Sequence, residues 1–370
     1  KTIGLIQTDP DYKLSKGETM TLITKAENYE GEEEVETTKG VKKYLYSVEL
    51  DNGALLLGCI DTAAADQTKS FNEARLGVSA ALNSASDLVA SSVIDSANTV
   101  TDKWETFVTL GGSHSRYETG SHVDLNMFNV AAGLSRGVLD NLTLGVFLEG
   151  GDGRYNTENK FVDGNVAAKG DVNYFGGGIF VKAEGKKTNL GQLHGEVSFR
   201  AGHINSKYNS PNFSSTNTYT SFDMSGAYLG AHAGFGYKWA IGNESDIDSY
   251  VKYLWNSQNG TSPVIGDEQF NLDAINSHRL RAGFRYNSKA DVNGFNFFGG
   301  LAYEYEFSGK ATGQAGEYTL IDSDFRGGSG MVEVGLKFQK GNSPWKGELA
   351  VQGYTGKRES IGVNLGVWYE

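Results

Sequence analysis

The sequence predicts an all-β fold: a 12-stranded antiparallel transmembrane β-barrel with an N-terminal α-helix threaded through the pore. Three observations predict it: twelve segments after residue 100 alternate apolar and polar residues, their connections differ in length between the two sides, and one slim helical stretch precedes them. Successive side chains of a strand point to opposite faces, so each segment has one apolar face. A closed barrel in a lipid bilayer gives all of these faces an apolar environment.

The last ten residues show the alternation without an error. One face carries Ile361, Val363, Leu365, Val367 and Tyr369, and the other carries Gly362, Asn364, Gly366, Trp368 and Glu370. Alternation alone fits both a lipid-facing barrel and a soluble β-sandwich, so other features must separate the two.

The lengths of the connections favour the barrel. The predicted strands span residues 104–117, 122–136, 141–155, 166–184, 192–209, 220–240, 246–258, 268–287, 294–307, 325–340, 345–356 and 359–370. Connections on one side lie at 118–121, 156–165, 210–219, 259–267, 308–324 and 356–358, and the short ones on the other side at 137–140, 240–245, 287–293 and 341–344. Long loops on one side and short turns on the other are typical of outer-membrane barrels, with the long loops extracellular.

Aromatic residues near the strand ends support the same fold, because such rings favour the membrane interface. They are Trp104, Trp239, Trp255, Trp345, Tyr303, Tyr305, Phe307 and Tyr369. In a sandwich, aromatic side chains would instead lie in the strand centres.

Composition excludes several classes of protein. No run of about 18 apolar residues occurs, so no transmembrane helix is predicted. The net charge of -12 and the lack of a basic cluster argue against nucleic acid as a partner. The single Cys59 cannot form an internal disulfide, and the six histidines are scattered without metal-ligand spacing. With no nucleotide, zinc-protease or serine-hydrolase motif, we expect neither a cofactor nor an enzyme.

The one sustained helical pattern covers residues 72–98, where Ala and Ser fill most positions. Ser70 and Glu73 have the spacing of a capping box. At ~1.5 Å per residue, such a helix matches the height of a membrane-spanning barrel, and twelve strands leave room for one thin helix. The residues expected on this pore helix are Asn72, Arg75, Leu76, Asn83 and Asp87.

Charged residues on the polar strand faces predict the inner wall of the pore. Arg279, Arg281 and Arg285 alternate on one strand, and Glu304 and Glu306 alternate on the next. Opposite charges on adjacent strands would balance one another inside the lumen. The tenth predicted strand adds Glu333 and Lys337 to the expected pore-facing set.

The order of parts resembles the translocator domain of type V secretion autotransporters over residues 71–370. The segment Tyr303–Phe307, followed by Gly309, Lys310 and Ala311, is similar to a late strand and loop of that family. Asn364, Gly366 and Tyr369 resemble the terminal signal that the barrel assembly machinery recognises in the family. Position 371 would carry the last aromatic of this signal, so we expect the natural chain to extend beyond Glu370.

The resemblance implies a division into three parts and a function. Residues 1–66 would be the end of a passenger, β-solenoid-like or autochaperone-like, residues 67–100 a pore-spanning helical linker, and residues 101–370 the barrel. The protein would anchor this passenger in the bacterial outer membrane and support its export to the cell surface, as a monomer. Its partners would be outer-membrane lipid, its own passenger and the barrel assembly machinery. The helix has no Asn-Asn pair, so we expect none of the self-cleavage known in some members.

Two other classes of membrane barrel stay open at this point. A passive porin or adhesin barrel has the same strands, but without a plug it would conduct readily. An outer-membrane barrel hydrolase would place catalytic residues at the extracellular rim, where His114 and Asp124 flank the first loop. The soluble sandwich is a third alternative, which partitioning into detergent would exclude.

Overall fold

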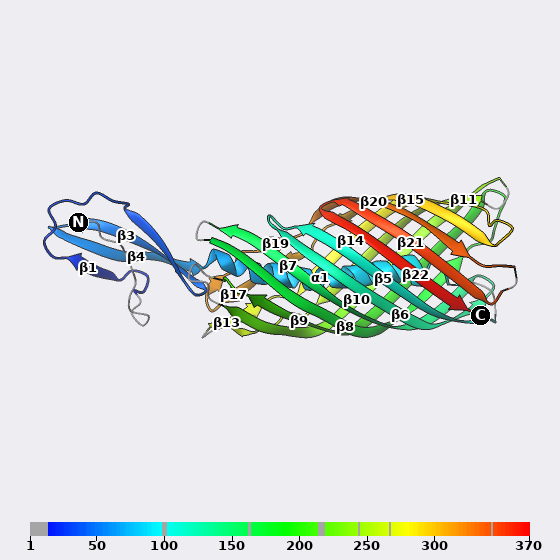
Figure 1. Ribbon diagram of the computed structural model, residues 1–370, viewed down its shortest axis with the longest axis horizontal. Helices are drawn as coiled ribbons and strands as arrows, with labels where there is room; N and C mark the ends of the chain where they lie inside the picture. The colour runs from blue at the N-terminus through cyan, green and yellow to red at the C-terminus, as the bar shows by residue number, and fades with distance from the viewer. Residues whose placement is uncertain are drawn as a thin grey trace.

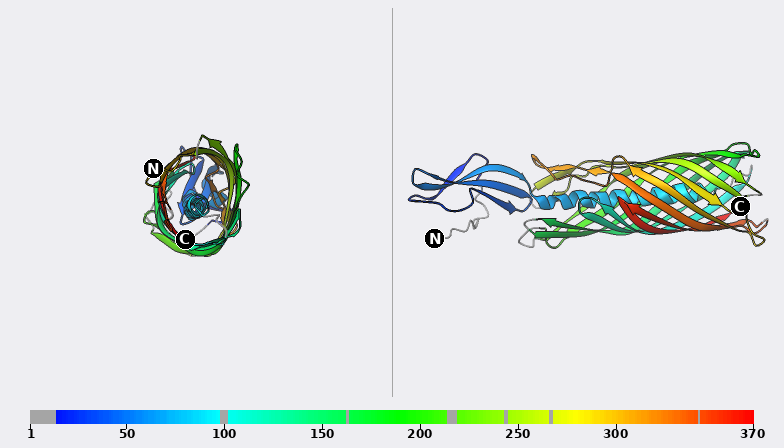
Figure 2. Two further views of the ribbon diagram at one scale, coloured as in Figure 1. Left: turned by 90° about the vertical axis from the view of Figure 1, so that its right-hand side faces the viewer. Right: turned by 90° about the horizontal axis from the view of Figure 1, so that it is seen from above.

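The computed structural model describes residues 14–97, 102–161, 164–213, 219–242, 245–265, 268–341 and 343–370. Its main body is a closed antiparallel barrel with a helix inside, and a small sheet projects from one end (Figures 1 and 2). The twelve barrel strands are β5 (Trp104–Glu118), β6 (His122–Leu139), β7 (Leu142–Phe161), β8 (Gly164–Glu184), β9 (Gly191–Ser210), β10 (Thr220–Ile241), β11 (Ser245–Gln258), β14 (Ile275–Asn287), β15 (Phe295–Glu306), β20 (Gly327–Phe338), β21 (Trp345–Gly356) and β22 (Arg358–Tyr369). The predicted fold is confirmed.

Closure comes from the last strand, which pairs with the first. The register of β22 and β5 runs from Arg358 opposite Tyr117 to Tyr369 opposite Thr106. All backbone groups of the wall can then pair within the barrel, as a bilayer requires. We call the end where the helix begins the N-terminal mouth, and the end where β22 finishes the C-terminal mouth (Figure 1).

The helix fills the lumen along the barrel axis (Figure 2). A 3-10 turn (Asp66–Thr68) leads into α1 (Lys69–Leu88), and a π-helical turn (Val89–Val93) follows. The predicted start was three residues too late, and the predicted capping box is wrong. Ser70 lies inside α1 and donates to the Gln67 carbonyl (2.8 Å), while Glu73 binds the barrel wall. No helix in the described part of the chain is long and apolar enough to cross a bilayer.

Two predicted segments differ most from the structure. Residues 268–287 form two strands, β13 (Glu268–Leu272) and β14, because the successive exposed residues Asp273 and Ala274 break the alternation. The predicted loop at 156–165 is largely strand, since β7 extends to Phe161 and β8 starts at Gly164. The outward side chains there are polar, as the exposed Asn156 shows, so this part of the wall continues beyond the apolar belt.

Short strands in the connections at the N-terminal mouth build two further small sheets. The first has the order β12-β13-β17-β18, and the second pairs β16 with β19. The predicted loop at 308–324 therefore carries strands of its own. Their bounds are β12 (Val264–Ile265), β16 (Lys310–Ala311), β17 (Gly313–Ala315), β18 (Tyr318–Thr319) and β19 (Ser323–Asp324).

The N-terminal sheet lies outside the barrel, beyond the N-terminal mouth (Figure 1). Its strands are β1 (Thr19–Ile23), β2 (Glu34–Lys39), β3 (Lys42–Asp51) and β4 (Ala54–Ala64), in the order β1-β4-β3-β2. Asn52 and Gly53 make the β3–β4 turn with φ of 49° and 78°. A core of Tyr44, Tyr46, Val48, Leu55, Leu57 and Cys59 holds the sheet together. Burial raises the pKa of the Cys59 thiol, as expected for a packing residue.

The outer surface of the barrel wall carries the apolar belt that the alternation predicts. On β7, Val146 is 52% exposed and faces outward at the same level as Ile179 of β8. The predicted interface aromatics Trp104, Trp345, Trp239 and Tyr369 are also exposed, toward the C-terminal mouth, whereas Trp255 is half-buried. The belt is therefore the lipid-facing surface of a membrane barrel.

A charge placed in the belt should destabilise the barrel far more than the same charge beyond it. We expect Val146→Arg to cost about 2–4 kcal/mol and the matched Asn156→Arg, on the same face of β7, about 0–1 kcal/mol. Urea unfolding in lipid vesicles measures both. Equal costs for the two variants would contradict this position of the membrane.

Candidate functional site

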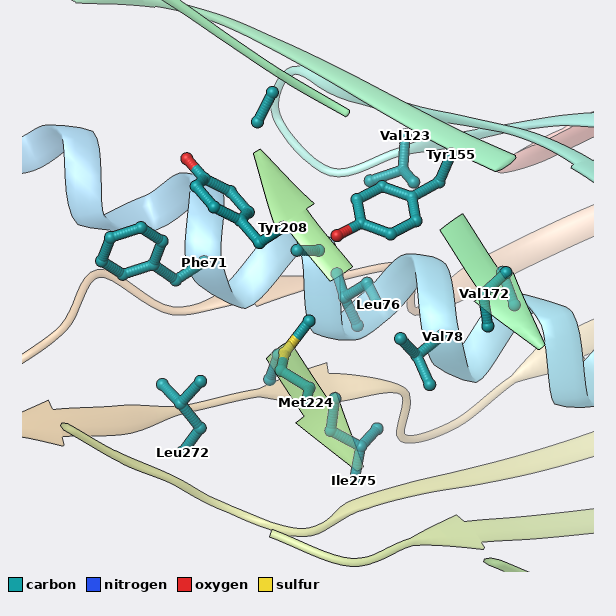
Figure 3. Close-up of a cluster of buried hydrophobic side chains, with 14 of the residues drawn as sticks. Phe71, Leu76, Val78, Val123, Tyr155, Val172, Tyr208, Met224, Leu272 and Ile275 are labelled. Carbon is teal, nitrogen blue, oxygen red and sulfur yellow. The ribbon is translucent and has the colours of Figure 1, made fainter. Parts of the chain in front are cut away.

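The contacts of the helix fall into three layers along the barrel axis. From Phe71 to Leu82 the helix packs in an apolar layer with Tyr155, Val172, Tyr208 and Met224 of the wall (Figure 3). A charged layer surrounds Asp87. A second apolar cluster joins Val89, Val93 and Ile94 to Phe107, Phe147, Phe180 and Trp368. The charged layer is thus enclosed between two apolar ones.

Phe71 is the centre of an aromatic cluster at the N-terminal mouth. Its ring lies 4.9–5.3 Å, between centroids, from four other rings, three of them edge-on. These are Tyr208, Phe213, Phe222 and Phe270. Such packing holds the first turn of α1 against β9, β10 and β13.

The buried carboxylate of Glu73 ties the helix to the opposite wall. It accepts hydrogen bonds from Thr119 Oγ1 (2.8 Å), Ser121 and Asn159, and Lys69 Nζ lies 3.2 Å away. These partners come from the β5–β6 connection and from β7. Their hydrogen bonds compensate the desolvation of the carboxylate.

Asp87 forms three ion pairs, more than any other described residue of the helix. Its two carboxylate oxygens accept from Arg279 (2.8 Å), Arg281 (2.7 Å) and Arg358 (2.7 Å). Glu304 completes the layer, at 2.6 Å from Arg281 and 3.3 Å from Arg279. The Arg358 guanidinium also lies 4.0 Å from the Tyr354 ring centroid. The carboxylates of Asp87 and Glu304 thus compensate most of the charge of the three buried guanidinium groups.

One helical turn before Asp87, Asn83 is held by hydrogen bonds rather than charge. Its side-chain oxygen accepts from Asn256 Nδ2 (2.7 Å) and Ser277 Oγ (3.1 Å). Asn83 and Asp87 are four residues apart, so they share the face of α1 that points to β11 and β14.

Asp95 forms a further ionic contact near the C-terminal mouth. It pairs with Lys252 (2.9 Å) and Arg285 (2.9 Å), and Arg285 also pairs with Glu333 (2.6 Å). Ser92 and Ser96 donate to Glu348 at 3.1 Å and 2.5 Å. The segment that follows α1 in the chain is therefore also held to the barrel wall by charged groups.

Glycines of β10 let long side chains from β9 reach β11. Arg200 crosses Gly230 to Asn256 (2.6 Å), and Glu196 crosses Gly234 to Lys252 (2.7 Å). A Cβ at Gly230 would lie 2.5 Å from Arg200 Nε, so an alanine does not fit there without a shift.

The structure brings most of the predicted site residues together. Arg279, Arg281, Arg285, Glu304 and Glu333 form the network around Asp87 and Asp95, and Leu76 is buried in the apolar layer. Two residues have other partners. Glu306 accepts from Ser277 and the His278 amide (2.8 Å), and Lys337 pairs with Glu348 (3.4 Å).

Several lumen residues were missed by sequence reasoning. Arg358 follows a short turn outside the predicted strand, and Glu149, Arg200 and Lys252 each pair with a residue two strands away. The sequence feature that could have indicated these contacts is the set of glycines in β10, which lets side chains of β9 extend across that strand.

The residues predicted as an assembly signal lie near the C-terminal mouth. Asn364 Nδ2 is 3.5 Å from Ser91 Oγ, and the Tyr369 ring packs on Trp345 with centroids 4.7 Å apart. Gly366 leaves space for the Trp368 ring, because a Cβ there would lie 2.1 Å from that ring.

The pair considered for a hydrolase does not form. His114 Nδ1 bonds to Asn126 (2.9 Å), and Asp124 pairs with Arg116 (2.6 Å). In the described ranges, no group of His, Cys, Asp and Glu side chains is arranged to hold a metal ion.

The geometry defines a class of protein: a membrane β-barrel whose pore is filled by a helix of its own chain. The sequence matches the family model for the autotransporter beta-domain over residues 106–349, which is well over half of the chain. The protein therefore belongs to the autotransporter β-domain family and is an outer-membrane translocator.

Solved structures of autotransporters share this fold. The translocator domain of NalP from Neisseria meningitidis aligns with a TM-score of 0.60 at 14% identity, over 81% of this chain and 99% of that one. The transport unit of AIDA-I from Escherichia coli gives 0.56 at 13% identity, over 81% and 99%. The β-domain of the Bordetella autotransporter BrkA gives 0.54 at 13% identity, over 72% and 99%. No curated protein is significantly similar in sequence.

Removing the charge of Asp87 should loosen the helix in the pore. Asp87→Asn keeps the shape but leaves buried guanidinium groups undercompensated, and we expect a loss of about 3–5 kcal/mol. The shift of the urea midpoint in detergent micelles measures this loss. The control is Asp152→Asn on the exposed face of β7, and an equally small effect of both variants would contradict the role of Asp87.

Proposed function

We propose that residues 1–66 are the end of an exported passenger, residues 67–100 its pore-spanning linker, and residues 101–370 its membrane anchor and export conduit. The path of the chain carries this proposal. Residues 14–66 precede the N-terminal mouth, α1 passes through the closed lumen, and β5 begins at the C-terminal mouth (Figure 1). A chain that is threaded in this way has passed through the barrel or has had the barrel close around it.

The two mouths differ in a way that supports an orientation. Connections at the C-terminal mouth are short, and those at the N-terminal mouth include the long segments 259–274 and 307–326. Long loops of outer-membrane barrels are extracellular. The N-terminal sheet then lies at the cell surface, with the C-terminal mouth in the periplasm.

The filled lumen supports a translocator over an open porin. The cavity beside Asn83 and Arg279 has a volume of about 20 Å³, which is room for about one water molecule. The charged layer around Asp87 retains the helix after export. Lumen residues such as Arg279, Arg281 and Asn256 form ion pairs and hydrogen bonds with the helix, which supports a role in binding the helix and sealing the pore.

The apolar belt supports outer-membrane lipid as the direct partner of the wall. The terminal strand, with Asn364, Gly366 and Tyr369, would be what the barrel assembly machinery recognises. The barrel closes on itself within one chain, so a monomer is sufficient for the function.

The orientation predicts which sites are accessible on intact cells. An epitope inserted between Asn52 and Gly53, at the tip of the β3–β4 hairpin, should bind antibody without permeabilisation. The matched epitope at Lys187, in the short β8–β9 connection, should need permeabilised cells. The reverse pattern would refute the export function.

The plug predicts the conductance of the purified protein. In planar bilayers the intact chain should conduct poorly, and deletion of residues 71–97 should open a stable conductance several-fold larger. The heat-modifiable gel mobility of both forms checks that the barrel is folded. A large conductance of the intact chain would favour the porin alternative.

A further inference from the structure

The two small sheets at the N-terminal mouth form a cap over the helix, which we call the lid: residues 259–265, 268–274 and 307–326. Its strands have two to five residues each, so the lid has little stability of its own. Phe270, Leu272, Leu320 and Phe325 of the lid are buried in one apolar layer with α1. The lid therefore depends on the helix for its core.

Helix side chains also hold the lid by its backbone. Arg75 Nη2 donates to the carbonyls of Asn259 (2.8 Å) and Asp273 (2.6 Å), at the two ends of the β11–β14 segment. Asn72 Nδ2 donates to the Ile321 carbonyl (2.8 Å) in the β15–β20 segment. Gln258 returns a bond to the Arg75 carbonyl (2.9 Å). Both segments of the lid are thus tied to the first two turns of α1.

Arg75 places a charged side chain in the interior of the protein, which is unusual for a residue that only packs. Its side chain is buried, with only 4% of the residue exposed, and the hydrogen-bond acceptors that the described residues offer it are those two carbonyls. Both bonds come from one nitrogen, Nη2, whose two hydrogens are donated to the two separate carbonyls, so this group must lie between the two ends of the segment. The contact forms only when the helix stands at one height in the pore, because each residue advances ~1.5 Å along the axis.

The polar face of the helix fixes that height. Asn72, Arg75, Asn83 and Asp87 are three, eight and four residues apart, so they lie on one face of the helix, and they contact the lid, β11 and β14 in turn. The helix position at which Asp87 pairs with Arg279 and Arg281 is also the position at which Arg75 binds the lid carbonyls. A segment of the passenger that moves through the pore and lacks this spacing would bind neither the lid carbonyls nor the lumen arginines.

We propose that the lid is a register-reading gate, which closes the outer mouth only when the linker helix has reached its final position, with Arg75 as the positioning residue. This rests on the proposed function, because it assumes that the passenger leaves by the N-terminal mouth. Closure also places Glu268 2.7 Å from Lys42 of β3, and the Tyr318 ring centroid 5.5 Å from the same ammonium. The closed lid thereby holds the N-terminal sheet against the outer mouth of the barrel.

Amide hydrogen exchange of the intact purified chain in detergent micelles tests the gate. In Arg75→Ala, amides of residues 268–274 and 313–320 should exchange about tenfold faster, while barrel strands and residues 80–88 of α1 keep their protection. Arg75→Lys should give an intermediate rate, because the ammonium keeps the charge and can still donate, but it does not reproduce the planar Nη2 group that lies between the two carbonyls. Ser92→Ala, which removes a helix–wall contact at the other end, should leave the lid unchanged.

A second variant tests register without removing Arg75. Deleting residues 78–81 draws Arg75 about 6 Å toward the C-terminal mouth when Asp87 stays in place, and the lid should lose its protection. Unchanged exchange of the lid in Arg75→Ala and Arg75→Lys, or equal acceleration in Ser92→Ala, would overturn the proposal. So would a protected lid in the deletion variant. Failure of the surface-epitope experiment would instead refute the export function and leave the coupling of helix and lid intact.

Discussion

The constraint on which the rest of the pore depends is the cost of a buried charge. Asp87 lies inside a closed barrel, where an unpaired carboxylate would be strongly destabilising. Three guanidinium groups from β14 and β22 pair with it, and Glu304 compensates part of the excess positive charge. The helix therefore cannot leave this position without exposing several arginines to one another, and its height in the barrel is fixed by charge.

The space left in the lumen admits only a helix with small side chains. The twelve strands set the width of the lumen, and long arginine and glutamate side chains already occupy much of it. The Ala and Ser residues of α1 leave room for these side chains to reach its backbone, as Arg200 does at the Leu82 carbonyl (2.7 Å). Gly77 shows the same limit, because a Cβ there would lie 3.0 Å from the Tyr155 ring.

The barrel could be predicted from the sequence because the pattern that indicates it lies within single strands and between neighbouring ones. Alternation along single strands identifies the lipid face, and the rows of Arg279, Arg281 and Arg285 against Glu304 follow from neighbouring strands. The partners of Asp87 were not predictable in the same way, because Arg358 reaches the lumen from the last strand through closure of the ring. The lid was missed for a related reason: the predicted strand 268–287 joined Phe270 and Leu272 to β14, although Asp273 and Ala274 break the alternation between them. The structure buries Phe270 and Leu272 against the helix.

The order of the layers explains why the ion pairs can fix the register. Apolar contacts are non-directional, so the clusters around Phe71 and Val93 would tolerate small shifts of the helix. Charged hydrogen bonds are directional, and they strengthen where water is excluded. By covering the Asp87 layer on both sides, the two apolar clusters keep it away from bulk water and raise the cost of any displacement. The apolar layers thus supply the seal, and the charged layer between them supplies the position.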